Sequence, residues 1–295
     1  MCAQSSLPRL LITLALITLV ASPVYAKRAE SEMIKLQDSR RSSAATVSMV
    51  SANFGGRGFW KVMPQCPQGM KCVMYTNNPV KVANGWIVDP TPYHTNMQKT
   101  HPNLFTSGRH SYGQISKTMV KNNMEAKFYK MNSFLLPQAT GVDIIFWCDA
   151  DSISIACQAP HLADRIRDSL SGHAMTVKTH EVRTSVRAEM KPAADYIKQK
   201  RGYPDGMKDI KDAWAHMEKM GFKDDAGLFH CDQFIFDARS PVVQSLFHTW
   251  WHEVQDYTFR DQISFPFVLQ HFNPSVRRIA RTQNILDMPR LEPTE

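Results

Sequence analysis

The 295-residue sequence lacks several features that would assign it to a broad class of proteins. It has no internal repeat, no cysteine and histidine spacing typical of a zinc site, and no run in which lysine or arginine alternates with aromatic residues. None of its asparagines begins an N-glycosylation sequon with an allowed middle residue. These absences argue against a repeat protein, a zinc finger and a nucleic-acid-binding protein.

Long hydrophobic runs are also absent, apart from one near the N-terminus. Arg9 precedes the mostly apolar residues 10–21, which are fewer than the roughly 20 needed to span a bilayer as a helix. Val24 and Ala26 fit the small-residue positions before a cleavage site, so we predict a signal peptide over residues 1–26. The alternative is an uncleaved signal anchor, the one case in which we expect a membrane attachment. Either places the body in the Golgi or ER lumen, or outside the cell.

Cysteine is scarce, with six residues in the whole chain. Cys2 would leave with the signal peptide, and the odd number that remains implies at least one unpaired thiol or an intermolecular bond in an oxidising compartment. Cys66 and Cys72 flank a short turn-rich loop, which favours a disulfide between them. Cys148 ends an apolar segment, so we expect it to be a buried small hydrophobe.

Acidic residues are outnumbered by basic ones, which gives a formal net charge of +8. A basic protein of this kind suits an anionic partner, such as a sugar-nucleotide diphosphate, an acidic polysaccharide or a membrane surface. An exported chain seldom meets nucleic acid. We therefore expect no nucleic-acid partner.

The pattern along the chain predicts an α/β fold. Residues 27–60 are polar and rich in small residues, and we assign them to a stem or linker; residues 61–287 form the predicted catalytic domain and 288–295 a tail. Apolar runs predict strands at residues 72–76, 86–88, 142–148, 175–178 and 228–236. Helical spacing predicts helices at 125–136, 184–200, 208–220, 241–255 and 261–271. Strands separated by helices indicate an α/β sandwich with a mainly parallel sheet.

Two aspartates follow the most convincing buried strand. Asp149 and Asp151 flank Ala150 directly after it, and in an extended backbone their side chains would point the same way. Ligands of open α/β sheets bind beyond the carboxyl ends of the strands, and two carboxylates suit Mn²⁺ or Mg²⁺ bound to a diphosphate. A chain of this length carries about one such pair by chance, so the motif alone does not establish a metal site.

Short motifs elsewhere resemble the signature of one family. The most specific is Arg260-Asp261-Gln262, followed by residues 263–269. The supporting segments are residues 127–131, 135–137, 180–183 with Glu189, and 251–253. Together they resemble a glycosyltransferase-like family, common in plants and also present in microbes, that was long catalogued as a domain of unknown function. Its plant members are associated with Golgi synthesis of pectin and mucilage polysaccharides.

The resemblance implies a GT-A-like, Rossmann-type α/β/α sandwich and a metal-dependent glycosyltransferase. The expected substrates are a nucleotide-sugar donor and a glycan, glycoprotein or lipid acceptor. By analogy, Asp261 orients the acceptor hydroxyl or acts as its base, and Gln262 binds the sugar. The remaining expected site residues are Tyr75, Thr76, Lys127, His180, Arg183 and Arg260 for the donor, and Asp149, Asp151 and His271 for Mn²⁺ or Mg²⁺. Many family members have one acidic residue where this chain has two, which leaves the metal set open.

His180 and Arg183 follow the predicted strand 175–178. They would share an edge with Asp149 if the sheet is parallel, where an arginine can contact a diphosphate through two hydrogen bonds. A surface arginine and a structural histidine are the plainer interpretation of the same residues. The hypothesis requires the Asp149 and Arg260 segments, far apart in the sequence, to meet at one site.

Other functions were weighed against glycosyl transfer. His248 and His252 lie four residues apart on a predicted helix, as in zinc hydrolases, but Thr249 stands where such enzymes need glutamate. Amphipathic packing explains this spacing more simply. A metal-dependent hydrolase of a glycan or a sphingolipid amide that uses the carboxylate site is a second alternative. A non-catalytic relic of the fold that binds nucleotide or glycan is a third.

Overall fold

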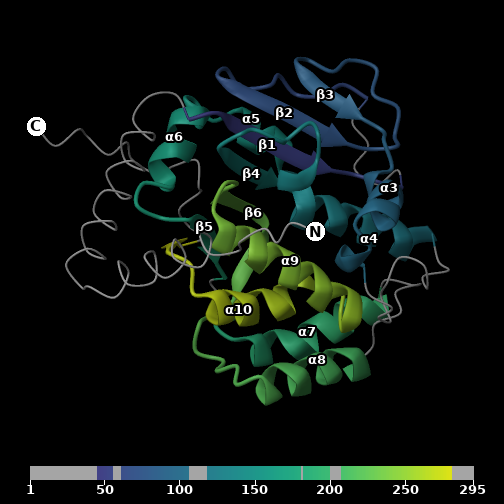
Figure 1. The fold of residues 1–295 in the computed structure, drawn as a ribbon, viewed down its shortest axis with the longest axis vertical. Coiled ribbons are helices and arrows are strands. Elements are labelled where there is room, and N and C mark those ends of the chain that lie inside the picture. Colours follow the sequence, from purple (N-terminus) through teal and green to yellow (C-terminus); the bar gives the residue numbers. More distant parts are fainter. Residues whose placement is uncertain (1–44, 56–60, 106–117, 181, 200–206, 281–295) are drawn as a thin grey trace, which may run out of the picture. The chain divides into compact units, whose positions relative to one another are not determined.

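Seven strands form one sheet in the spatial order β3-β2-β1-β4-β6-β5-β7 (Figure 1). The computed structural model describes residues 45–55, 61–105, 118–180, 182–199 and 207–280. Among them the strands are β1 (Val47–Ala52), β2 (Met70–Tyr75), β3 (Trp86–Asp89), β4 (Ile144–Cys148), β5 (Met175–Thr179), β6 (Phe229–Asp237) and β7 (Val276–Ile279). β6 runs antiparallel to its neighbours β4 and β5, whereas the other adjacent strands of this sheet are parallel.

Helices cover both faces of the sheet. They are α3 (Tyr93–Thr100), α4 (Thr118–Asn132), α5 (Ile153–Cys157), α6 (Leu162–Ser169), α7 (Val186–Gln199), α8 (Met207–Lys219), α9 (Pro241–Asp256) and α10 (Asp261–Phe272), with short 3₁₀ turns η1 (Pro102–Leu104) and η2 (Ser133–Leu135). α4 packs on β1 and α9, and α10 packs on β6, where alternate strand residues join one large apolar core. α6 packs on β1 from the opposite face, and its Ser169 carbonyl accepts a hydrogen bond from Thr176. The predicted α/β/α sandwich with a mainly parallel sheet is confirmed.

β1 corrects the predicted stem. Residues 27–60 were expected to be linker, but Val47–Ala52 form a strand between β2 and β4 whose six residues are all buried. Ser48 and Ser51 give this strand a polar composition although both are fully buried. The Ser48 hydroxyl donates to the Lys71 carbonyl at 2.9 Å. A compact unit covers Thr46–Glu295.

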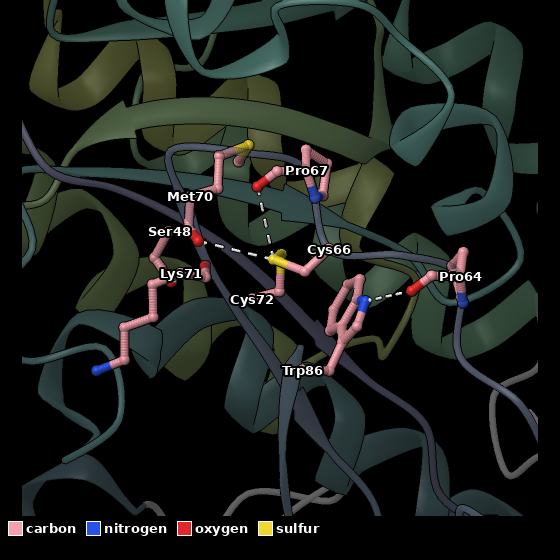
Figure 2. The surroundings of a disulfide bond; sticks show 8 residues. All are labelled: Ser48, Pro64, Cys66, Pro67, Met70, Lys71, Cys72 and Trp86. Carbon is pink, nitrogen blue, oxygen red and sulfur yellow. Dashed lines mark hydrogen bonds between the residues drawn. A yellow bond between two sulfur atoms is a disulfide. The ribbon is translucent and has the colours of Figure 1, made fainter. Parts of the chain in front are cut away.

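The predicted disulfide between Cys66 and Cys72 is present, with a Cα–Cα distance of 5.9 Å (Figure 2). It closes the loop that leads into β2. Beside it, the Trp86 indole donates to the Pro64 carbonyl at 2.9 Å and links the same loop to β3. Cys148 is buried and unpaired, as expected.

Several predictions fall outside the described residues, namely the signal peptide over 1–26 and the tail over 288–295. Among the helices that the structure describes, none combines the length and apolar character needed to span a bilayer.

Candidate functional site

The two aspartates of the Asp149-Ala150-Asp151 motif lie in a turn, not in the extended backbone that the sequence predicted. β4 ends at Cys148, and the Ser152 N–H donates to the Asp149 carbonyl at 2.9 Å. The turn leads directly into α5. Asp151 is exposed, whereas Asp149 is partly covered. Side chains two residues apart point the same way only in an extended backbone. The turn therefore does not by itself place the Asp149 and Asp151 carboxylates on one side.

Lys130 of α4 joins the two motifs that the sequence singled out. Its buried ammonium lies 3.0 Å from Oδ1 of Asp149 and 3.1 Å from Oδ2 of Asp261, and it donates to the Cys231 carbonyl at 2.7 Å. The Trp147 indole donates to the same Asp149 oxygen at 2.6 Å. The Asp149 turn and the Arg-Asp-Gln segment therefore meet at one point.

Asp261 is the most strongly paired carboxylate of the site. It is the first residue of α10, its side chain is 4% exposed, and it accepts hydrogen bonds from Lys127 and Lys130. Burial alone would raise the pKa of Asp261, but the two ammonium groups outweigh burial and hold the pKa below its usual value. Asp261 is therefore ionised, and its protonated form is disfavoured.

The two lysines differ in their environments. Burial lowers the pKa of Lys127, against the opposing effect of Asp261. For Lys130 burial acts in the same direction, but Asp149 and Asp261 together outweigh it and raise the pKa. Lys130 is thus a permanently charged bridge. Lys127, whose side chain is 19% exposed, is the lysine nearer to solvent.

A second ionic group lies next to this one. Glu189 of α7 is fully buried, and its two carboxylate oxygens face two arginines. Arg183 Nε lies 2.8 Å from Oε2, and Arg260 Nη2 donates to Oε1 at 3.0 Å. The side chains of both arginines are more than a quarter exposed. The predicted His-x-x-Arg segment and the Arg-Asp-Gln segment are therefore joined through Glu189.

The start of β6 completes the same edge of the sheet. Asp149 N–H donates to the Asp232 carbonyl at 2.8 Å, so these residues are opposite one another across the β4–β6 pair. His230 stacks on His180, with ring centroids 4.4 Å apart. Lys178 Nζ lies 3.7 Å from Oδ2 of Asp232, while Oδ1 of Asp232 is buried without a hydrogen-bond partner among the described residues.

Thr258 and Gln262 show how α10 begins. The helix starts at Asp261, and just before it the Thr258 hydroxyl accepts a hydrogen bond from the Arg260 N–H at 3.2 Å. Gln262 is buried, and its amide donates to the Phe229 carbonyl at 3.2 Å. Gln262 therefore links α10 to the start of β6.

Tyr75 and Thr76 lie apart from this group. Tyr75 is the last residue of β2 and Thr76 follows it, and β2 is two strands away from β4, a separation of about 10 Å. Tyr75 is fully buried against Tyr129, and the Thr76 hydroxyl donates to the Asn53 carbonyl. The structure does not bring them into contact with the charged group.

His271 is also separated from the predicted metal site. It lies one residue before the end of α10, whereas Asp261 is the first residue of that helix. Ten helical residues span about 15 Å. His271 is exposed and packs beside Phe267 and Phe272.

The described residues contain no group of three or more histidine, cysteine, aspartate or glutamate side chains arranged to hold a metal ion. At the Asp149 turn, Trp147 and Lys130 both contact Oδ1. Oδ2 of Asp149 and the exposed Asp151 carboxylate are the oxygen atoms that could still bind a cation.

The histidine pair of α9 does not form the zinc-hydrolase site that the sequence already argued against. His248 and His252 lie with their Nε2 atoms 3.1 Å apart, but Glu253 points elsewhere and accepts a hydrogen bond from His216 of α8 at 3.1 Å. No third metal ligand joins the pair in the part of the chain that the structure describes.

Sequence reasoning missed Lys130, His230 and Asp232. Lys130 lies three residues after Lys127, so helical spacing places both on one face. Asp232 and His230 precede the apolar part of β6, and a signal for them was available only if β6 had been predicted to run antiparallel to β4.

Comparisons with known proteins give only distant matches. No family profile and no curated protein sequence matches the chain. Among solved structures, the apo form of mouse xyloside xylosyltransferase 1 is similar, with 10% identity and a TM-score of 0.42 over 79% of this chain and 84% of that one. The apo structure of WbbM, a bifunctional glycosyltransferase, is similar over 81% of this chain and 39% of that one, with 12% identity and a TM-score of 0.38.

Proposed function

We propose that this protein is a glycosyltransferase that uses a nucleoside diphosphate sugar as donor and a glycan, glycoprotein or lipid as acceptor. The observation that carries the proposal is the contact of Lys130 with both Asp149 and Asp261. It brings the Asp-x-Asp turn and the Arg-Asp-Gln segment to one place at the carboxyl edge of β4. In open α/β sheets this edge is where ligands bind.

The charged side chains of this edge suit a diphosphate. Arg183 and Arg260 are held by the buried Glu189 but are each more than a quarter exposed. Guanidinium groups fixed in this way can donate paired hydrogen bonds to phosphate oxygens. We assign Arg183, Arg260 and the more exposed Lys127 to donor binding, with His180 supporting Arg183 at 2.9 Å.

A divalent cation fits the site only with help from the donor. Mg²⁺ and Mn²⁺ prefer hard oxygen ligands, and Mg²⁺ is often held by one or two carboxylates together with substrate phosphates. Asp149 and Asp151 can supply two such carboxylates, and the buried Asp232 Oδ1 opposite Asp149 is an acceptor of the same kind. When bound, the cation would offset the negative charge of the diphosphate leaving group. His271 is not part of this assignment.

Asp261 has a positioning role in this proposal, not that of a base. Its carboxylate is engaged by two lysines, and its lowered pKa makes it a weak proton acceptor. It holds Lys127 and Lys130 beside the Asp149 turn. Gln262 is fixed against the start of β6 and fills the wall of the site behind Asp261.

The first test is binding. The full chain is heated with a panel of nucleoside diphosphates, with and without Mn²⁺, and one nucleotide is expected to raise the melting temperature only when the cation is present. A free nucleotide concentration of 100 times Kd would stabilise the folded protein by about 2.7 kcal/mol. An unchanged melting temperature across the panel would contradict donor binding.

Variants and products then separate the alternatives. An Asp151→Asn protein should fold normally and lose the cation-dependent part of the shift, whereas Asp164→Asn, on the exposed start of α6, should not change it. Release of sugar from a nucleotide sugar supports a transferase. Cleavage of a glycan or sphingolipid amide without nucleotide supports a hydrolase, and binding without turnover of any donor supports a relic of the fold.

A further inference from the structure

His248 and His252 form a pair on α9 outside the site described above. They lie one helical turn apart, both side chains are partly exposed, and their Nε2 atoms are 3.1 Å apart. Trp251 and Gln255 lie on the same face of α9 at helical spacing, and their side chains donate to the Leu104 carbonyl of η1. The histidine pair therefore lies beside the contact that holds α9 against η1.

The separation of the two nitrogen atoms matches that of two ligands on one metal ion. Zinc–imidazole bonds are about 2.0–2.1 Å long, and a tetrahedral angle between two of them separates the nitrogen atoms by about 3.3–3.4 Å. The observed distance is within a few tenths of an ångström of this value.

The protonation and orientation of His252 also favour a metal. Burial and the neighbouring His248 lower the pKa of His252, so the ring is neutral at pH 7 and offers a lone pair. Its ring is also hydrogen-bonded to the backbone of Asn103. A second hydrogen bond of this kind fixes the ring orientation of histidine ligands in metal sites.

The surroundings define the coordination. Asp256 lies one turn beyond His252 on the same helix, and its negative charge opposes the lowering of the His252 pKa. The described residues supply no third histidine, cysteine or acidic ligand in ligating position. Water would therefore complete the coordination sphere, as at the open positions of other zinc sites.

We propose that His248 and His252 form a two-histidine chelating site for a borderline transition-metal ion such as Zn²⁺. Imidazole suits Zn²⁺, Ni²⁺ and Cu²⁺, whereas Mn²⁺ and Mg²⁺ prefer the oxygen ligands of the Asp149 turn. The chain thus has two sites with different preferences. Occupation of the histidine site cross-links one turn of α9 and stabilises its contact with η1.

The test is a calorimetric titration of the full chain, purified without a polyhistidine tag, with Zn²⁺ at pH 7.5. Wild type should bind saturably and melt at a higher temperature with Zn²⁺. His248→Gln and His252→Gln should each weaken binding by roughly tenfold or more, because each removes one arm of the chelate. His271→Gln changes an exposed histidine of α10 and should leave binding unchanged.

His248→Gln guards against loss of folding, because it leaves the hydrogen bond between His252 and the Asn103 backbone in place. Failure of wild type to bind Zn²⁺ overturns the proposal. So does binding that survives unchanged in folded His248→Gln, because the ion would then lie elsewhere. Mn²⁺ serves as the comparison ion, and its affinity should not respond to either histidine variant.

Discussion

At the scale of single residues, Lys130 places one buried ammonium group between the carboxylates of Asp149 and Asp261. Burying an ion is unfavourable unless its partners are close, and removing one member of a buried pair leaves the others without compensation. Lys127 shares Asp261 but has no ion pair with Asp149. Lys130 is therefore the residue on which the charge balance of the site depends.

Lys130→Met should destabilise the protein by about 3–5 kcal/mol, because two carboxylates lose a buried counterion. Without that counterion the folded-state pKa of these carboxylates rises, so the deficit should be larger at pH 8 than at pH 5. Urea unfolding at both pH values measures this. Lys211→Met, at an exposed position of α8, is the control; a loss below about 1 kcal/mol for Lys130→Met would contradict the bridging role.

Asp261→Asn separates positioning from base catalysis once a donor has been identified. If Asp261 positions the two lysines, the variant should raise the donor KM and weaken nucleotide binding in calorimetry, because Lys127 and Lys130 lose their shared anion. A general base contributes about 10²–10⁴-fold to the rate. A loss of that size in kcat with unchanged KM, together with loss of the acidic limb of the pH–rate profile, would assign Asp261 as the base instead.

At the scale of helices and strands, α8 and α9 meet at a buried acidic residue that takes no part in the candidate site. Glu253 of α9 is largely buried and accepts a hydrogen bond from His216 of α8. His216 stacks on Tyr257, with ring centroids 4.3 Å apart. Burial, and to a lesser extent Asp256, raises the pKa of Glu253 from 4.5 to about 7.

This raised pKa makes stability depend on pH in a defined direction. Between pH 4.5 and about 7 the folded state retains a proton on Glu253 that the unfolded state releases. Stability therefore falls as pH rises through this window, and the full penalty applies above it. Glu253→Gln should be more stable than wild type by about 1–3 kcal/mol at pH 8 and nearly equal to it at pH 4.5.

Thermal unfolding of Glu253→Gln and wild type across this pH range measures the effect. The glutamine oxygen can still accept the His216 hydrogen bond, so the change isolates the charge. Glu218→Gln, at an exposed position of α8, is the matched control and should show no such trend. A glutamine variant that is less stable than wild type at pH 8 would mean that the ion pair with His216 outweighs burial.

The strands show which elements can be recognised from sequence. β2, β3, β4, β5 and β6 were predicted because each contains an apolar run. β1 was missed because its buried serines resemble linker residues, and β7 because Arg277 and Arg278 interrupt its apolar pattern. Secondary structure is readable where burial and composition agree. At β1 they disagree, since the serine side chains are buried by tertiary packing.

Burial that arises only from tertiary packing also limited the prediction of the candidate site. The resemblance identified Arg183, Glu189, Arg260 and Asp261. The structure pairs both arginines with Glu189 and pairs Asp261 with Lys127, so these residues form two ionic groups that adjoin at the consecutive residues Arg260 and Asp261. Lys130 lies within the matched segment 127–131 but was not assigned to the site, because the sequence alone does not show which lysines become buried. Tyr75 was among the residues expected to bind the donor, but its side chain is buried against Tyr129, a contact that the sequence does not reveal.

At the scale of the whole molecule, the charged group occupies the middle of the sheet. β4 and β6 are neighbours in the strand order, and β5 with its following residues adds His180 and Arg183 from the next strand. α4 and α10 bring Lys130 and Asp261 from one face of the sheet. The site therefore depends on the neighbouring strands β4, β6 and β5, and on β1 as the strand on which α4 packs.

Truncation tests this dependence directly. A chain of residues 45–295 retains β1 and the contact in which Thr46 N–H donates to Asp143 at 2.8 Å, and it should unfold cooperatively within about 4 °C of a chain of residues 27–295. A chain of residues 61–295, the domain that the sequence predicted, lacks β1. Its loss would expose the apolar core and leave the facing backbone groups of β2 and β4 unpaired.

We therefore expect residues 61–295 to show no cooperative thermal transition by circular dichroism, although they retain the Cys66–Cys72 disulfide and every charged residue of the candidate site. The comparison separates two views of the first 60 residues. If residues 61–295 show the same cooperative thermal transition as residues 45–295, β1 is dispensable for folding. The stem would then cover residues 27–60, as the sequence predicted. If only the longer chain folds, six weakly hydrophobic residues determine whether β2 and β3 are held to β4, and whether α4, which carries Lys130, keeps the strand on which it packs.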